Sequence, residues 1–96
     1  MPDVLNNESE KQFEITTAGE KAYLTYRFYK DDIALMHTFV PKALEGQGIA
    51  SALAKEAFRY AAEHKKPVMV YCPFVAQFVK RHPEYQKQLD PQYLQA

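Results

Sequence analysis

The change in hydrophobic period on the two sides of residues 40–50 is the feature that most constrains the fold of this chain. Before this stretch apolar residues alternate with polar ones, and after it they recur at helical spacing. The stretch itself, VPKALEGQGIA, therefore predicts the end of a strand, a short loop and the start of a helix. Glycine at Gly46 and Gly48 permits dihedrals that a Cβ disfavours, and the first helical N–H groups lack intrahelical acceptors. Such a loop is suited to bind an anion, although an ordinary strand-to-helix turn has the same pattern.

Three segments before the glycine loop have the alternation and the aromatic content that are typical of β-strands. They cover residues 13–16, 21–30 and 33–40, and short turns join them. Strands connected in this way form an antiparallel meander. In the third strand, the alternation places His37 on the same face as Leu35.

The segment after the loop predicts a helix, a strand and a second helix. Apolar residues recur at helical spacing for about four turns from Ile49, and Pro67 prevents the helix from continuing. Residues 68–71 form a short apolar strand, which a right-handed crossover pairs in parallel with the strand before the helix. An initial proline and the apolar spacing predict a second helix over residues 73–81, with a further helical turn near Tyr85. The predicted fold class is therefore α/β (α+β).

The composition indicates one small domain without an overall charge. The chain has 96 residues, and its 12 Lys and Arg residues balance 12 Asp and Glu residues, so we expect neither nucleic acid nor a membrane as a partner. The polar residues 1–12 lack the features of a signal peptide, and we expect them to be a flexible lead-in to a single domain at 13–96. One cysteine excludes an internal disulfide and agrees with a reducing compartment. We therefore expect a cytoplasmic monomer.

Two separated motifs resemble a known family. The run GQGIA at residues 46–50, after the predicted strand, resembles the acyl-CoA pyrophosphate loop of the GCN5-related N-acetyltransferase (GNAT) superfamily. The consensus of that loop is Gln or Arg, two residues, Gly, one residue, then Gly or Ala, and Glu45 stands where the family prefers Gln or Arg. Residues 70–75 (VYCPFV), followed by RHPEY at 81–85, are similar to a small single-domain branch with a Cys after the strand that follows the main helix. The resemblance covers residues 13–89.

The resemblance implies a protein that takes acetyl-CoA, or CoA or another acyl-CoA, as cosubstrate and transfers an acetyl group to an unidentified amine. This acceptor is a small molecule or a protein. The pyrophosphate is expected on the main-chain amides of residues 45–50, and the pantetheine between the strands that end near Val40 and Cys72. The residues that the resemblance assigns to cofactor binding are Val40, Glu45, Gly46, Gln47, Gly48, Ile49, Ala50, Arg81 and His82.

Cys72 is the first candidate catalytic residue. It lies between a predicted strand and a helix that opens with Pro73, so the partial positive charge of the helix N-terminus would stabilise its thiolate. A free cysteine is also commonly a small buried apolar residue. The resemblance favours the reactive role, because the slot for the acyl thioester opens at the end of this strand in the GNAT fold.

His37 is the second candidate catalytic residue. An imidazole can accept a proton near neutral pH, and the resemblance places its strand beside the acyl carbonyl. A core or interface role is the alternative. Two mechanisms are open: direct attack by an amine with His37 or a water as base, or prior transfer of the acyl group to Cys72.

Other interpretations of the same residues stay open. Arg81 and His82 also suit the end of a helix, where cations are favoured. The three histidines and one cysteine lack the spacing of metal ligands, so we expect no metal. The alternative function is a non-catalytic CoA-binding or regulatory module, because the chain is short for the superfamily. A protein-interaction domain that uses Tyr23 and Tyr29 is a third hypothesis.

Overall fold

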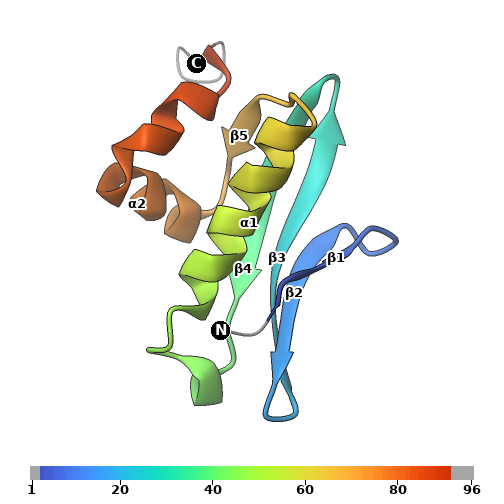
Figure 1. Cartoon of the computed structure of the whole chain (residues 1–96), viewed down its shortest axis with the longest axis vertical. Coiled ribbons are helices and arrows are strands. Elements are labelled where there is room, and N and C mark those ends of the chain that lie inside the picture. The colour runs from blue at the N-terminus through green and yellow to red at the C-terminus, as the bar shows by residue number, and fades with distance from the viewer. Residues whose placement is uncertain (1–2, 92–96) are drawn as a thin grey trace.

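The computed structural model describes residues 3–91 and contains one five-stranded sheet with strand order β1-β2-β3-β4-β5 (Figure 1). The first four strands pair antiparallel, and β5 pairs parallel with β4. Along the chain the elements are β1 (Leu5–Asn7), β2 (Gln12–Thr17), β3 (Glu20–Tyr29), β4 (Asp32–Phe39), the 3₁₀ turn η1 (Lys42–Leu44), α1 (Ile49–Glu63), β5 (Val68–Val70), α2 (Pro73–Arg81) and the 3₁₀ turn η2 (Pro83–Gln88). The predicted α+β fold, with a meander, a helix, a parallel strand and a second helix, is confirmed. No helix within residues 3–91 combines the length and apolarity needed to cross a bilayer.

β1 lies in the stretch for which the sequence predicted a flexible lead-in, and the structure differs from that expectation. Leu5–Asn7 pairs with β2 at the edge of the sheet. The Tyr26 hydroxyl donates a hydrogen bond to Asn6 Oδ1 at 2.7 Å, and Asn7 Nδ2 donates to Glu14 Oε2 at 3.0 Å. These asparagines look like solvated residues in the sequence, because their partners lie far along the chain.

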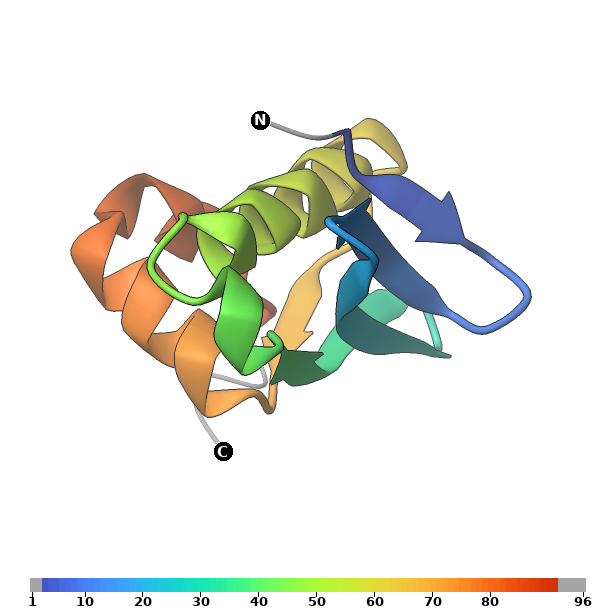
Figure 2. The ribbon, with the colours of Figure 1, turned by 90° about the horizontal axis from the view of Figure 1, so that it is seen from below.

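The helix α1 packs across one face of the sheet, the upper face in Figure 2. Its alanine-rich stripe lets the helix approach the strands closely. The buried residues of α1 are Ile49, Leu53, Ala54, Ala57, Phe58 and Ala61. The Phe58 ring lies 6.3 Å from that of Phe78 in α2 and 4.9 Å from that of Tyr85 in η2. These contacts fix the C-terminal half of α1 relative to α2 and η2.

A β-bulge in β4 determines which side chains of this strand face the helices. Tyr26 of β3 pairs with Leu35, but its neighbour Thr25 pairs with His37, so Met36 is the extra residue. The alternation of side chains therefore reverses at Met36. The prediction that His37 shares a face with Leu35 is wrong: Leu35 is fully buried on the helix side, whereas His37 is exposed on the other side.

The bulge also marks the point at which β4 and β5 diverge. Their parallel ladder ends at the pair Leu35–Val70 and at a hydrogen bond of 2.9 Å from the Tyr71 N–H to the Leu35 carbonyl. Beyond it, Thr38 Oγ1 and Cys72 Sγ are 3.0 Å apart and connect the two segments by their side chains. The main-chain pairing of the two strands therefore ends at this point, and the side chains of Thr38 and Cys72 connect the two segments beyond it.

The segment after η2 returns to the sheet and brings two carboxyl groups together. Leu89 forms a parallel bridge with Val68, and the Asp90 N–H donates to the Val68 carbonyl at 3.0 Å. The Asp90 carboxyl hydrogen-bonds that of Asp32, which is only 8% exposed. Burial, this hydrogen bond and the charges of Asp90 and Asp31 raise the pKa of Asp32 to about 6.

Because of this carboxyl pair, we expect Asp32→Asn to make the stability of the protein less dependent on pH. The pKa of Asp32 is about 6 in the folded chain, above its ordinary value of 3.8. Between pH 3.8 and 6 the folded chain therefore keeps a proton that the unfolded chain has lost. The bound proton of Asp32 therefore stabilises the folded chain fully below about pH 4, and this stabilisation is lost as the pH rises through about 6. An asparagine amide can still donate to Asp90. We expect the variant to match wild type near pH 4 and to be more stable by roughly 2 kcal/mol above pH 7.

Urea titration at several pH values measures this difference. Glu14 titrates with the opposite sign, because burial raises its pKa but hydrogen bonds from Gln12 and Asn7 and the charge of Lys21 outweigh burial and lower it overall. This contribution is common to both proteins and cancels in their difference. Equal pH profiles of the two proteins would exclude a shared proton between Asp32 and Asp90.

Candidate functional site

The glycine loop joins β4 to α1 in a conformation that depends on its two glycines. Gly46 and Gly48 have φ angles of +80° and +76°, in the left-handed region. A Cβ at Gly46 would meet no atom within 4 Å, so glycine is required there for its backbone angle and not for space. Gly48 is the N-cap of α1, and no side chain caps this helix. The next residue, Ile49, is 2% exposed and anchors the loop in the core.

The 3₁₀ turn η1 precedes these glycines and was not predicted from the sequence. Leu44 is 2% exposed, and its N–H donates to the Pro41 carbonyl at 2.8 Å. The Glu45 N–H donates to the Lys42 carbonyl at 3.2 Å. The amide of Glu45 is therefore already used within the protein, although the sequence interpretation included it in the anion site.

The main-chain N–H groups that follow are free to bind a ligand. Within residues 3–91, no protein group accepts a hydrogen bond from the N–H groups of residues 46–51, and the first helical bond of α1 runs from Ala52 to Gly48 at 3.0 Å. The positive end of the α1 dipole lies at the same place. Since the chain has no net charge, any attraction for an anion here is local.

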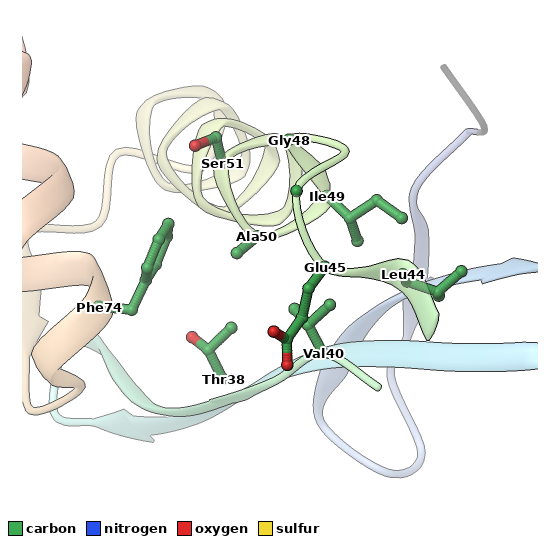
Figure 3. A pocket seen from close by; sticks show the side chains of 10 residues that line it. Thr38, Val40, Leu44, Glu45, Gly48, Ile49, Ala50, Ser51 and Phe74 are labelled. Carbon is green, nitrogen blue, oxygen red and sulfur yellow. The ribbon is translucent and has the colours of Figure 1, made fainter. Parts of the chain in front are cut away.

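A cavity of about 390 Å³ opens beside these amides (Figure 3). β4, the loop, α1 and α2 all contribute to its wall. The lining residues are Thr38, Val40, Leu44, Glu45, Gly46, Gly48, Ile49, Ala50, Ser51 and Phe74. Figure 3 shows Phe74 projecting from α2 beside Ala50, and Thr38 projecting from β4 below Ala50. The Glu45 side chain extends beside Val40, with its carboxylate away from the N-terminus of α1 in this view.

A second cavity of about 290 Å³ continues the first one along α2. Both include Ser51 and Phe74 in their walls, and the second extends to Arg81 and His82. The His82 ring lies 4.6 Å from that of Phe78. The structure thus brings the glycine loop and the Arg81–His82 pair to one continuous groove.

Cys72 is the N-cap of α2, as the sequence predicted, and no side chain caps this helix either. It is 3% exposed and is not itself among the described residues that line the two cavities. Its contact partner Thr38, however, lies in the wall of the first cavity. The sulfur is therefore next to the cavity but screened from it, which is compatible with both the reactive and the packing interpretation.

His37 does not join this site. The bulge turns it to the opposite face of the sheet, where its ring lies 6.4 Å from that of Tyr23. It borders a separate groove of about 800 Å³, together with Thr25 and Arg27. The two candidate catalytic residues therefore lie on opposite faces of the sheet.

The sequence interpretation missed four residues that line the first cavity, namely Thr38, Leu44, Ser51 and Phe74. Ser51 lies in the first turn of α1, directly after the glycine loop, and Phe74 lies in the first turn of α2, two residues after Cys72, so both positions could have been found from the predicted helix starts. Thr38 could not be recognised, because the alternation of β4 assigns it to the wrong face until the bulge is known.

In this mixed sheet the parallel strands β4 and β5 diverge beside the glycine loop, at the start of the main helix. This is the arrangement that the resemblance to acetyltransferases implied. The family model described as GCN5-related N-acetyl-transferase matches residues 12–89. The chain belongs to this GCN5-related N-acetyltransferase family, which confirms the resemblance found in the sequence.

Several known proteins are similar to this chain. Protein NATD1 of Danio rerio is 35% identical over 95 residues, which cover 96% of this chain and 81% of that protein. Protein NATD1 of Homo sapiens is 32% identical over 93 residues, covering 92% and 82%. The NMR structure of a GCN5-like protein from Staphylococcus aureus superimposes with a TM-score of 0.73 at 26% identity, covering 92% of this chain and 87% of that one. The relatives and the solved structure therefore agree on the family and the fold.

Proposed function

We propose that this protein binds acetyl-CoA, or another acyl-CoA, and transfers the acyl group to an amine on a small molecule or a protein. The observation that carries the proposal is the run of free N–H groups at residues 46–51, which opens onto a cavity between β4 and α2. Main-chain donors at a helix N-terminus stabilise a diphosphate without requiring a basic side chain. The family to which the chain belongs supports the same ligand.

The groove has the right order of features for an extended acyl-CoA. In this arrangement the pyrophosphate lies on the amides of residues 46–51. The pantetheine runs past Val40 and Thr38 toward the gap between the diverging strands, where its amides can pair with the free edge of β4. The nucleotide end occupies the second cavity near Arg81 and His82.

Glu45 does not prevent this binding mode. Its carboxylate is exposed and extends away from the N-terminus of α1, so water and salt screen its repulsion of a phosphate. Its position in the family loop would favour Gln or Arg, and we expect the charge to reduce the affinity without abolishing it.

Calorimetric titration with CoA tests the proposal. We expect saturable one-to-one binding, accompanied by shifts of the amide resonances of Gly46 and Gly48 in a ¹H–¹⁵N spectrum. No heat of binding, or shifts confined to other parts of the chain, would contradict the proposed site.

Arg81→Ala tests the position of the nucleotide end. Arg81 is exposed on α2 and borders the second cavity, where it can pair with the 3′-phosphate of CoA. We expect the variant to bind CoA about 10-fold more weakly, the equivalent of roughly 1.4 kcal/mol, and to bind dephospho-CoA as wild type does. Lys80→Ala is the matched control, because Lys80 is also exposed on α2 but does not line the cavity. An equal loss for both ligands would place the 3′-phosphate elsewhere.

Two routes for the acyl group follow from the positions of the candidate residues. In direct transfer, the amine attacks the thioester, and His37 can act as base only for an acceptor that reaches the gap from the opposite face of the sheet. In the covalent route, Cys72 accepts the acyl group first. Thr38 connects this sulfur to the cavity wall and supports the second route.

The second candidate function is a non-catalytic CoA-binding module, and the 3% exposure of Cys72 favours it. Release of free CoA thiol from acetyl-CoA, measured across a panel of amines, distinguishes the two functions. Turnover above the rate without amine supports the transferase. Binding without turnover supports the module.

The compartment and the oligomeric state belong to the same proposal. We propose a cytoplasmic monomer, since the only cysteine of the chain needs a reducing environment to remain a free thiol. Fractionation of cells and light scattering of the purified protein measure these two properties.

A further inference from the structure

β3 extends beyond β2, and this leaves part of one strand edge without a partner. β2 pairs with residues 20–25 of β3, whereas β4 pairs with β3 as far as Tyr29 (Figure 1). The paired part ends at the turn between β1 and β2, where the Tyr26 N–H donates to the Lys11 carbonyl at 2.9 Å. Beyond Tyr26, no strand within residues 3–91 pairs with β3 on the side away from β4.

The main chain of Phe28 points to this free edge. Phe28 pairs with Ile33, whose own N–H donates to the Pro67 carbonyl at 3.0 Å, on the side of β4 that faces β5. The Phe28–Ile33 pair therefore exchanges no main-chain bonds, and the N–H and C=O groups of Phe28 face away from β4. The Tyr26 N–H, two residues earlier, has the same direction. An extended chain can add to such an edge as a further strand.

A groove lies at the same edge. It has a volume of about 800 Å³, compared with about 390 Å³ for the cavity beside the glycine loop. Phe28 forms part of its wall together with Lys11 and Arg27. The groove also includes His37, which faces away from α1, so it lies across the sheet from the cavity proposed for CoA. A ligand in this groove therefore leaves the CoA site free.

The charges around the free edge favour an acidic ligand. Lys11 and Arg27 line the groove, and neither forms an ion pair with any residue of the range 3–91. On the other face of the strand, Lys66 Nζ lies 4.9 Å from the centre of the Phe28 ring. Glu10 is the only carboxylate among the described residues of the groove wall. Positive charge therefore predominates here, although the whole chain has no net charge.

We propose that this edge binds an extended, acidic segment of a partner protein, which adds to the sheet as a strand beside residues 26–29 of β3. The N–H and C=O groups of Phe28 pair with the main chain of the segment. Because side chains alternate between the two faces of a strand, acidic side chains of the segment lie over Lys11 and Arg27, and apolar ones pack on the Phe28 ring. This ring is 43% exposed in the free protein, so its burial adds to the binding.

Hydrogen exchange of the Phe28 amide tests the proposal with the synthetic peptide Ac-Glu-Val-Glu-Val-Glu-NH₂ as probe. We expect saturable binding with a Kd below about 1 mM, and exchange of the Phe28 amide at least about tenfold slower in the saturated protein. The Arg27 amide, which faces β4, should keep its exchange rate. The peptide Ac-Lys-Val-Lys-Val-Lys-NH₂ should bind more weakly. Absence of binding, or binding that leaves the Phe28 amide unprotected, overturns the proposal.

Phe28→Pro and Phe28→Ala form a matched pair that separates the main chain from the ring. Both remove the ring, but only proline removes the outward N–H, and proline is tolerated on a strand edge whose N–H faces solvent. We expect the proline variant to bind the acidic peptide at least about tenfold more weakly than the alanine variant. Equal affinities overturn the strand-addition mode. If the proline variant does not fold, the exchange of the Phe28 amide in wild type still decides.

Arg27→Ala tests the preference for an acidic segment. We expect it to weaken binding of the acidic peptide about fivefold at low salt. Lys55→Ala is the control, because Lys55 is exposed on α1 and does not line the groove, and its affinity should equal that of wild type. The same affinity in both variants would show that charge does not select the ligand.

This surface and the proposed function can fail separately. CoA and the peptide should bind independently, so the Kd of CoA should be the same with and without the peptide. If CoA does not bind but the peptide protects the Phe28 amide, the proposed function is wrong and the surface stands. If light scattering shows dimers that Phe28→Pro abolishes, the edge pairs with a second copy of this chain, and the proposed partner is wrong.

Discussion

Replacing Gly48 by valine is expected to weaken CoA binding by at least about 100-fold while the fold is retained. Gly48 has a φ of +76°, a region that β-branched residues avoid, and the chain relieves this strain by rotating the peptide units of the loop. That rotation turns away N–H groups of the set at residues 46–51. Each hydrogen bond to a charged group contributes about 1.5–3 kcal/mol, so the loss of one or two gives this factor.

Gly19→Val is the control for strain alone. Gly19 also has a φ of +76°, but it lies in the turn between β2 and β3 and does not border the groove. Both variants should lose similar stability in urea, of the order of 1–2 kcal/mol. Only the variant at Gly48 should lose CoA affinity in calorimetry. Equal CoA affinity of the two variants would show that the amides at the start of α1 do not hold the ligand.

Elements with a strong local signal could be predicted from the sequence. The bounds of α2, Pro73–Arg81, agree with the prediction, because an initial proline and an apolar stripe mark this helix without reference to the rest of the fold. The glycine loop was predicted for the same reason: a positive φ at Gly46 and Gly48 is a local requirement.

The bulge at Met36 could not be predicted, and it changed the interpretation of the site. Methionine is tolerated on either face of a strand, so the sequence of β4 gives no indication of the extra residue. An unbroken alternation was the natural prediction, and it placed His37 on the face of Leu35 and Thr38 on the opposite face. The structure reverses both. Thr38, which contacts the candidate nucleophile Cys72, is therefore the residue whose position the alternation failed to predict.

Contacts between distant residues explain the other differences. β1 is held by side chains of Asn6 and Asn7 that bond Tyr26 and Glu14, and the Asp32–Asp90 pair joins the start of β4 to the segment after η2. Polar residues of this kind resemble a solvated tail when only neighbours in sequence are compared. Their partners become apparent only when the sheet is assembled.

Incubation with acetyl-CoA should add one acetyl group to wild type and none to Cys72→Ala. The position of Cys72 matters more for this reaction than its general reactivity. Cys72 is 3% exposed, so general acylating reagents reach it poorly, whereas an acyl-CoA held on residues 46–51 brings its thioester along the cavity to Thr38 and the sulfur. We therefore expect acetyl-CoA to label the protein faster than a small thioester at the same concentration.

The alanine variant is suited to this comparison because it disturbs little else. Removing the sulfur leaves the Thr38 hydroxyl at the wall of an open cavity, where water can replace its partner, so the loss of stability should be small. Transfer to an amine then separates the mechanisms. If Cys72→Ala transfers the acetyl group at the wild-type rate and wild type carries no adduct, the amine attacks the thioester directly and the sulfur is a packing residue. If the variant binds CoA as wild type does but transfers nothing, the acyl group passes through Cys72, because binding alone does not require that side chain.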